Sequence, residues 1–385
     1  MKLYVQLWNS PGLMRVVFAQ ILARFPYGMM VLAIVMHVQH VFQSYAIAGL
    51  AMGAETIMSA ISGPILGRLV GRTGIMKIFV PTSILSFTIF LLLAYTPFAA
   101  WWVIMLCGIL GFIQPPIQSV ARTVYPKLIK PELRPSIFAL DATSQELIWI
   151  LGPVLATFAA AQVSTVFAMV LMALIQAVGI LLFLTDVNVR NTKIEKTEKQ
   201  IGHVMKNRKV ITMVILGTVL VASFAGMEIP TVALIDKSLS GAVVAVFSIG
   251  SIIGGLTLGH RAPGKWSIPT LFILASVGYA LSLFAPDNPV WLSICWFIGG
   301  IAVAPLLGIV NSMISASTSD ADALEAYGWL NTGQLLGYAG AAVVVGFLID
   351  NVNAATSLWV AIGFAIIGLC VSLVGINSMP KRTSH

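Results

Sequence analysis

Long apolar stretches without charge dominate the chain. Residues 78–121, 147–185 and 288–319 contain no Lys, Arg, Asp or Glu over 44, 39 and 32 consecutive positions. One membrane-spanning helix needs about 20 apolar residues, so these stretches predict helix–turn–helix pairs, with Thr96 and Pro97 marking one turn. The sequence lacks the alternation over segments of about ten residues that is typical of a membrane β-barrel. The pattern therefore predicts an all-α membrane protein.

The hydrophobic pattern predicts twelve spans and one long polar connection. Residues 186–209 hold ten of the 36 charged residues and separate six spans from six. We therefore divide the chain into a six-helix bundle at 1–187, a linker at 188–207 and a second six-helix bundle at 208–385. Ile194, Ile201 and Met205 recur in the linker at roughly helical spacing, which fits either a helix on the membrane surface or a solvated connection. The predicted spans are 14–38, 43–69, 76–96, 100–124, 135–160, 163–186, 209–233, 240–259, 266–285, 290–315, 323–348 and 355–377.

Composition and charge exclude a soluble globule and fix an orientation. Of the 385 residues, 58% are hydrophobic and 9% are charged, whereas soluble domains carry about 25% charged residues. The net charge of +8 therefore does not indicate a nucleic-acid partner. With the N-terminus inside, 20 of the 22 Lys and Arg residues fall on the cytoplasmic side, and only Lys237 falls outside. This asymmetry predicts a multi-pass plasma-membrane protein with both termini and the linker in the cytoplasm.

The residues that carry catalytic or metal chemistry do not form recognisable patterns. Cys107, Cys295 and Cys370 lie far apart in apolar runs, which gives neither a disulfide framework nor a metal-ligand spacing. The sequence has no G-x-x-x-x-G-K-[ST] motif for a nucleotide and no Ser/His set for nucleophilic catalysis. We therefore expect no metal, no cofactor and no enzymatic activity.

The two predicted bundles repeat one another. The matches pair residues 63–68 with 255–261, 111–115 with 300–305, and 140–142 with 324–326. Each pair falls in corresponding spans of the two halves. Such repeats are typical of transporters in which a midplane site between two bundles is exposed alternately to each side.

Residues 67–77, GRLVGRTGIMK, resemble the loop between helices 2 and 3 of the major facilitator superfamily, whose pattern is G-x-L-x-D-R-x-G-x-x-[RK]. The matching residues are Gly67, Leu69, Arg72, Gly74 and Lys77, while Gly71 stands where the family has Asp. In the family that carboxylate helps to latch the bundles on the cytoplasmic side. The resemblance implies a gating loop in which Arg72, at the matched position, matters more than Arg68.

A second resemblance lies in the fifth span. Gly152 and Pro153 form the core of the pattern G-x3-G-P-x2-G-G that is found in antiporters of the family, although Ile148, Ala156 and Thr157 replace its other glycines. Proline removes a backbone donor, so we expect a kink there. Cys107 stands where many proton-driven exporters carry Arg, in the family's R-x-x-x-G of helix 4. The Gly-Pro core favours export.

Charged residues inside the spans are candidates for substrate or coupling-ion binding, because an unpaired charge in the membrane is costly. Arg24 and Glu55 are placed at matched height in the first two spans, so we expect them to pair. Arg122 is the expected partner of Asp141. Glu146 has no evident basic partner and is a candidate proton carrier, and each of these residues could instead be purely structural. Polar residues that could line the path are Gln20, Gln114, Gln118, Gln145, Asn311, Asn331 and Gln334.

The resemblance implies a secondary transporter that moves a small molecule by alternating access. Because the antiporter core is present, we expect export driven by protons or another ion, by a monomer in a bacterial inner membrane. A symporter or uniporter that imports a nutrient, or a membrane sensor on a transporter fold, remains an alternative. The sequence gives no substrate.

Overall fold

The computed structural model describes residues 2–95, 99–192, 201–235, 237–259 and 263–375. Within these ranges all regular elements are helices, and twelve of the helical stretches are long and apolar enough to cross a membrane. The all-α membrane fold with twelve spans is therefore confirmed. The boundaries at 187/188 and 207/208 stay a prediction.

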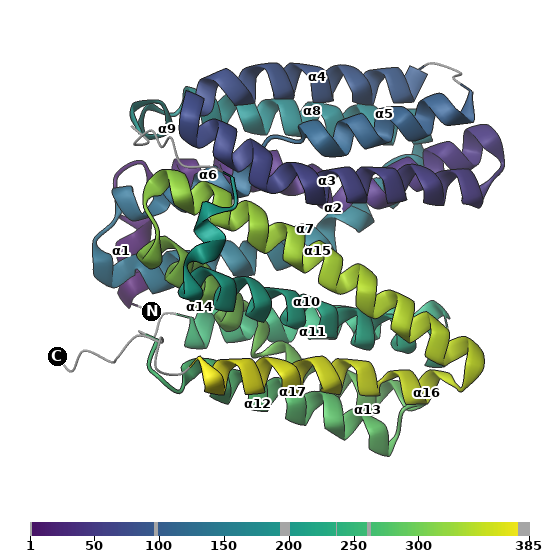
Figure 1. Ribbon diagram of the computed structural model, residues 1–385. Coiled ribbons are helices and arrows are strands. Elements are labelled where there is room, and N and C mark those ends of the chain that lie inside the picture. Colours follow the sequence, from purple (N-terminus) through teal and green to yellow (C-terminus); the bar gives the residue numbers. More distant parts are fainter. Residues whose placement is uncertain (1, 96–98, 193–200, 236, 260–262, 376–385) are drawn as a thin grey trace.

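The first six spans form one bundle (Figure 1). Its interior consists of apolar side chains from these spans, with Phe79, Tyr125 and Phe183 among the largest that are fully buried. The spans are α2 (Leu13–Phe42), α3 (Tyr45–Thr73), α4 (Ile75–Tyr95), α5 (Ala100–Ile113) with α6 (Ile117–Leu128), α7 (Arg134–Gln162) and α8 (Thr165–Thr185), and the short elements are α1 (Lys2–Trp8), η1 (Pro131–Leu133) and α9 (Val187–Asn191).

The last six spans form the second bundle, which has its own apolar core around Trp296, Tyr279 and Phe272. Its spans are α10 (Arg208–Leu234), α11 (Lys237–Leu258), α12 (Ser267–Leu281) with η3 (Ser282–Phe284), α13 (Pro289–Gly300) with α14 (Val303–Ser317), α15 (Asp320–Asn351), and α16 (Ala354–Ser357) with α17 (Trp359–Val374). The fourth span of each bundle is interrupted, which agrees with the internal repeat.

The interruption in the first bundle lies between α5 and α6, at Gln114, Pro115 and Pro116. Two consecutive prolines remove two backbone donors, and each disfavours the helical conformation of the residue before it. The fifth span behaves differently, because α7 is helical without a break through Pro153. The helix that is interrupted is therefore the fourth span, and the kink expected at Pro153 in the fifth span stays a prediction.

The short elements α1 and α9 lie at one end of the molecule (Figure 1). We call this end the linker side, because η2 (His203–Lys206), the described end of the linker, packs there against the beginnings of α10 and α15. The opposite end is called the far side. Ile201 and Met205 lie in a turn and in η2, while Ile194 lies outside the described residues, so the surface helix expected in the linker stays a prediction.

The two bundles contact each other mainly through α3 and α15, and through α7 with α11 and α14. Figure 1 shows α15 running obliquely, close to α3 near the linker side and away from it toward the far side. At the close end, Gly63 packs on Gly328, and Gly67 packs on the backbone of Leu324. The absence of side chains at these glycines lets the two helix backbones touch. The bundles are thus closed against each other on the linker side.

Candidate functional site

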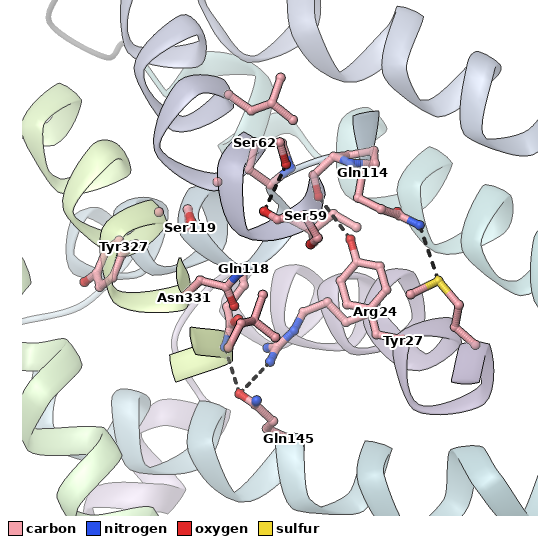
Figure 2. A pocket seen from close by; sticks show the side chains of 18 of the residues that line it. Arg24, Tyr27, Ser59, Ser62, Gln114, Gln118, Ser119, Gln145, Tyr327 and Asn331 are labelled. Carbon is pink, nitrogen blue, oxygen red and sulfur yellow. Dashed lines mark hydrogen bonds between the residues drawn. The ribbon is translucent and has the colours of Figure 1, made fainter. Parts of the chain in front are cut away.

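A cavity of about 240 Å³ lies between the two bundles. Its wall comes from α2, α3, the α5–α6 break, α6 and α7 of the first bundle, and from α15 of the second (Figure 2). Gly63 and Gly328, which touch across the bundles, also line the cavity, so the closed linker side forms its floor. The polar and charged lining residues are Arg24, Tyr27, Glu55, Thr56, Ser59, Ser62, Gln114, Gln118, Ser119, Arg122, Gln145, Tyr327 and Asn331.

Two arginines at the cavity wall share one carboxylate. Asp141 on α7 binds Arg24 Nη1 through Oδ1 at 3.0 Å and Arg122 Nε through Oδ2 at 2.8 Å. The side chains of the three residues are almost completely buried. The expected Arg122–Asp141 pair is therefore confirmed. The expected Arg24–Glu55 pair is wrong for this conformation, because Asp141 reaches Arg24 from α7, an element that sequence neighbourhood alone did not bring to α2.

Amide side chains hold the arginine cluster in place. Arg24 Nη1 donates to Gln20 Oε1 at 2.8 Å, and its Nη2 donates to Gln145 Oε1 at 3.0 Å. Gln118 on α6 also bonds Gln145 at 2.8 Å (Figure 2). These contacts join α2, α6 and α7 at one wall of the cavity. The sequence had marked these three glutamines as polar residues within spans. Gln20 and Gln145 thus bond the guanidinium group of Arg24, and Gln118 bonds Gln145.

The carboxylate of Glu55 lies in the same cavity without a basic partner. Among the described residues its only hydrogen-bond partner is the hydroxyl of the adjacent Thr56, at 3.3 Å. The residue is only 5% exposed. Arg24 and Glu55 thus line one cavity, from α2 and α3, without forming an ion pair. Glu55 is the lining carboxylate that is available to a ligand.

Glu146 occupies a different position, at the contact between the bundles. Its side chain on α7 points to α11, where Ser251 Oγ donates to its Oε1 at 3.0 Å. The residue is buried and is not among those that line the cavity. The sequence placed Glu146 deep in a span without a basic partner, and the structure adds that its environment changes whenever α7 and α11 separate.

The gating loop makes its cross-bundle contacts through an unexpected residue. Arg68 is 1% exposed, and its Nη1 lies 3.1 Å from Asp322 Oδ1 and 3.2 Å from Glu325 Oε2 on α15. Arg72, which occupies the matched position of the family pattern, is exposed. The buried ion pairs with α15 belong to Arg68, so the packing draws attention to Arg68 beside Arg72, and the ranking of the two arginines stays a prediction.

The missing Asp of the family pattern has a steric explanation. A Cβ at Gly71 would lie 3.1 Å from the Cβ of Ala321, so an Asp side chain at this position would require α3 and α15 to move slightly apart. The acidic partners instead come from α15 of the other bundle. Gly74, further along the loop, has φ of 96°, a conformation that L-residues rarely adopt, and Lys77 follows at the start of α4.

Two further contacts complete the closure on the linker side. Lys127 Nζ, at the end of α6, lies 2.5 Å from Asp320 Oδ2 at the start of α15. The backbone N–H of Gly202 donates to Glu325 Oε1 at 2.5 Å. The described end of the linker is therefore bound to the same carboxylate that faces Arg68.

Gly152 makes a close helix contact in the first bundle. A Cβ at this position would meet the backbone of Gly28 and Met29 on α2. A Cβ at Gly28 would in turn meet the backbone of Ile148. The Gly-Pro core of the fifth span thus corresponds to the site where α7 and α2 approach most closely, next to the cavity wall formed by Ile148.

The family model of the Major Facilitator Superfamily matches residues 16–266 and 229–384. The chain belongs to this superfamily. The expected family is therefore confirmed, and membrane transport is its general function. No protein among those with curated functions matches the sequence.

Solved structures of superfamily transporters share the fold. The human organic anion transporter MFSD10 (TETRAN) matches with a TM-score of 0.75 and 14% identity, over 93% of this chain and 98% of that chain. A bacterial homologue of the iron transporter ferroportin in an outward-facing state matches with a TM-score of 0.76 and 10% identity, over 95% and 99%. Both likenesses confirm two six-helix bundles of the superfamily type.

Sequence analysis did not identify the acidic residues of α15 that contact Arg68 on the linker side. Asp322 and Glu325 lie at the start of the eleventh span, and the internal repeat had already paired Glu325 with Asp141. That correspondence was a usable signal, because each carboxylate binds arginine in the structure. Among the described residues no group of His, Cys, Asp and Glu could hold a metal ion.

Proposed function

We propose that this chain is a secondary active transporter that exports a small molecule by alternating access, driven by the proton gradient. The observation that carries the proposal is the cavity between the bundles, which is lined by charged and amide side chains and closed on the linker side. A midplane site at the interface of two repeats is where such transporters bind their substrates. The absence of a nucleotide motif in the sequence leaves an ion or substrate gradient as the energy source.

Export is supported by the close contact of Gly152 with α2, since the Gly-Pro core resembles that of antiporters. The coupling ion is proposed to be the proton, because Glu55 and Glu146 are buried carboxylates without an ion-pair partner among the described residues. Such groups inside a membrane typically carry protons or bind cations. Import by proton symport is the alternative. The direction of substrate flux relative to proton flow distinguishes export by exchange from symport.

The linker side is proposed to face the cytoplasm of a bacterial cell, with the chain acting as a monomer. Basic residues gather at the linker-side ends of the spans, including Arg72, Lys77, Lys130, Lys206 and Lys265. Lys237 begins α11 on the far side. A bias of this kind orients membrane proteins with the basic side inward.

Flux measurements in proteoliposomes test the proposal. Purified protein is reconstituted, a panel of small organic molecules is loaded, and a pH gradient of each sign is imposed. Export by exchange predicts substrate movement against the direction of proton flow. Movement with the protons would indicate a symporter, and flux independent of the gradient a uniporter. Absence of flux for the whole panel under every gradient would contradict transport.

A reversible crosslink supplies the matched control for alternating access. Gly71→Cys with Ala321→Cys, in a variant without the native cysteines, places two thiols across α3 and α15. The Cβ positions are 3.1 Å apart, so a separation of the helices by a few tenths of an ångström brings them to the distance of about 3.5–4.5 Å in disulfides. Oxidation is expected to lock the linker side and stop flux, and a reductant is expected to restore it. Full flux in the oxidised protein would exclude opening on this side.

A further inference from the structure

The charges around the cavity are unevenly distributed between its walls. Charged lining residues in the described part of the chain are Arg24, Arg122 and Glu55. Asp141 lies behind the arginines and binds both of them. One carboxylate for two guanidinium groups leaves one positive charge in excess at that wall. Glu55, with only the Thr56 hydroxyl as partner, leaves one negative charge in excess at the other wall.

The described side chains do not bring these two charges together. Arg24 is held by Gln20, Asp141 and Gln145, so its guanidinium group is fixed at the α7 side of the cavity. The phenol of Tyr27 donates to the backbone oxygen of Pro115 at 3.1 Å and thereby braces the broken fourth span next to both charges. The site therefore presents a positive and a negative wall that are kept apart by the helices that carry them.

From this arrangement we infer that the cavity binds a small amphoteric organic molecule, whose acidic group approaches Arg24 and Arg122 and whose ammonium group approaches Glu55. A neutral ligand would leave both excess charges uncompensated. An anion would leave Glu55 unpaired, and a cation would leave the arginine wall unpaired. Because unpaired charges away from bulk water are costly, a ligand with both charges fits best. The inference rests on the proposed function and names its substrate class.

The remaining lining residues fit such a ligand. Met30, Val31, Ile148, Trp149 and Leu335 supply apolar wall between the polar groups. Ser59, Asn331 and Gln114 supply additional hydrogen-bonding groups (Figure 2). A few fixed polar groups in a mostly apolar wall are typical of small-molecule sites. The cavity of about 240 Å³ suits a molecule of one ring with its substituents.

Proton exchange follows from the same geometry. An ammonium group and a proton compete for the carboxylate of Glu55, so binding one disfavours the other, as exchange requires. Tyr27 on α2 and Cys107 on α5 interact with Glu55. The other titratable or charged groups that line the cavity are Arg24 on α2, Arg122 on α6 and Tyr327 on α15. Glu55 is the carboxylate of this set, so it is the group whose negative charge either an ammonium group or a proton neutralises.

Three probes with one carbon skeleton test the inference by binding alone. The amphoteric probe is 4-(aminomethyl)benzoate, which carries both charges. The second probe, 4-methylbenzylamine, carries only the positive charge, and the third, 4-methylbenzoate, carries only the negative charge. Isothermal titration calorimetry on the purified full chain in detergent is expected to give an affinity for the amphoteric probe at least about tenfold above either relative. The inference would be overturned if 4-methylbenzylamine or 4-methylbenzoate bound as tightly as the amphoteric probe. It would also be overturned if the amphoteric probe did not bind.

Variants and pH then locate the ammonium group. Glu55→Gln is expected to reduce affinity for the amphoteric probe about tenfold and to leave that for 4-methylbenzoate unchanged. Glu228→Gln is the matched control, since Glu228 bonds Tyr338 in the second bundle at 2.9 Å, outside the cavity. Acidification is expected to reduce the affinity of the unaltered protein for the amphoteric probe. The affinity of Glu55→Gln for the same probe is expected to stay unchanged. The same pH dependence in both would overturn the role of Glu55.

The binding result is independent of the flux result. Titration in detergent needs neither a gradient nor movement across a membrane, so selective binding of the amphoteric probe with no flux would uphold the site and contradict transport. Gradient-driven flux of other compounds, with no preference for the amphoteric probe, would uphold transport and contradict the substrate class. If Glu55→Gln fails to fold, the comparison of the three probes on the unaltered protein still decides.

Discussion

Arg68 on α3 and Asp322 on α15 bind each other across the two bundles, with 3.1 Å between Nη1 and Oδ1. Glu325, one turn further along α15, lies 3.2 Å from the same nitrogen. The first bundle thus supplies the cation and the second bundle the anions. Both ion pairs therefore join α3 of the first bundle to α15 of the second on the linker side.

Substitution of Arg68 is expected to damage transport more than substitution of Arg72. Arg68→Ala leaves two acidic side chains buried without their arginine at the closed interface, which costs roughly 3–5 kcal/mol for a buried pair. We expect flux to fall at least about tenfold, the effect of roughly 1.4 kcal/mol on the balance between the two conformations. Arg72→Ala, at an exposed position of the same loop, is expected to change flux less than about twofold.

Labelling of Ala321→Cys provides a second readout for the same pair. Ala321 is buried against Gly71 in the closed state. In the Arg68→Ala background a thiol reagent that is applied from the linker side is expected to react faster than in the Arg72→Ala background. Equal rates in both backgrounds, together with equal flux, would mean that the ion pair does not hold the bundles together.

Breaking the Arg24–Asp141 pair is expected to reduce stability. Arg24→Ala leaves the buried carboxylate with Arg122 alone, and Asp141→Asn leaves two guanidinium groups next to each other. A double-mutant cycle on thermal stability in detergent should show strong coupling, since the two side chains are in direct contact at 3.0 Å. The cycle for Arg24 and Glu55 should be close to additive. Coupling between Arg24 and Glu55, with none between Arg24 and Asp141, would favour the Arg24–Glu55 pair that the sequence spacing suggested.

Much of the fold was predictable because one physical constraint dominates it. Backbone groups in hydrocarbon must be satisfied within each helix, so the number of spans follows from apolar length, as for α2, α4 and α8. The break at Pro115 and Pro116 was less predictable. Pro153, by contrast, lies within a continuous helix. Whether a proline interrupts a membrane helix therefore depends on how the neighbouring helices pack and not on the proline alone.

The site was predictable in its residues and in one of its pairings, Arg122 with Asp141. Arg24, Glu55, Asp141 and Gln145 all lie in or beside the cavity, because a charged or amide group deep in a span needs polar surroundings. Which residue meets which depends on helix rotation and on contacts between distant spans. Consecutive helices suggested Arg24 with Glu55, whereas α2 turns Arg24 toward α7.

The orientation of the chain can be tested by labelling from one side. Lys206 is exposed in η2 on the linker side, and Asp287 is exposed between η3 and α13 on the far side. In a variant without native cysteines, we expect Asp287→Cys and not Lys206→Cys to react with an impermeant thiol reagent on intact cells. Permeabilised cells should label at both positions. Reaction of position 206 from outside would reverse the proposed topology.

Alanine at Gly152 is expected to destabilise the protein, against the usual preference of helices. In an open helix position, glycine to alanine is favourable by about 0.5–1 kcal/mol. At Gly152 the new methyl group would meet the backbone of Gly28, so α2 and α7 must move apart. The matched control is Gly53→Ala, since nothing lies within 4 Å of that position. Thermal stability should fall for the first variant and not for the second, and equal stability would contradict close packing at the Gly-Pro core.

Glu146 lies where a proton could sense the separation of the bundles. In the present conformation its carboxyl group is buried between α7 and α11 and bonded to Ser251. We expect that opening of the linker side separates α11 from α7 and lets water reach this position, where an ionised carboxylate is well solvated. A proton on Glu146 would then be linked to the conformation, as coupling requires.

Glu146→Gln is expected to keep substrate binding and to remove the dependence of flux on the pH gradient. The amide fixes the neutral form and retains an oxygen that can accept the hydrogen bond of Ser251. Ser251→Ala keeps the carboxyl group and removes one of its two serine donors, Ser248 being the other. Flux of this variant should still follow the gradient, with a shifted pH profile. Glu228→Gln serves as the control for loss of a partly buried carboxylate elsewhere. Flux in proteoliposomes under pH gradients of both signs measures all three, and unchanged pH-driven flux in Glu146→Gln would exclude this residue as the proton carrier.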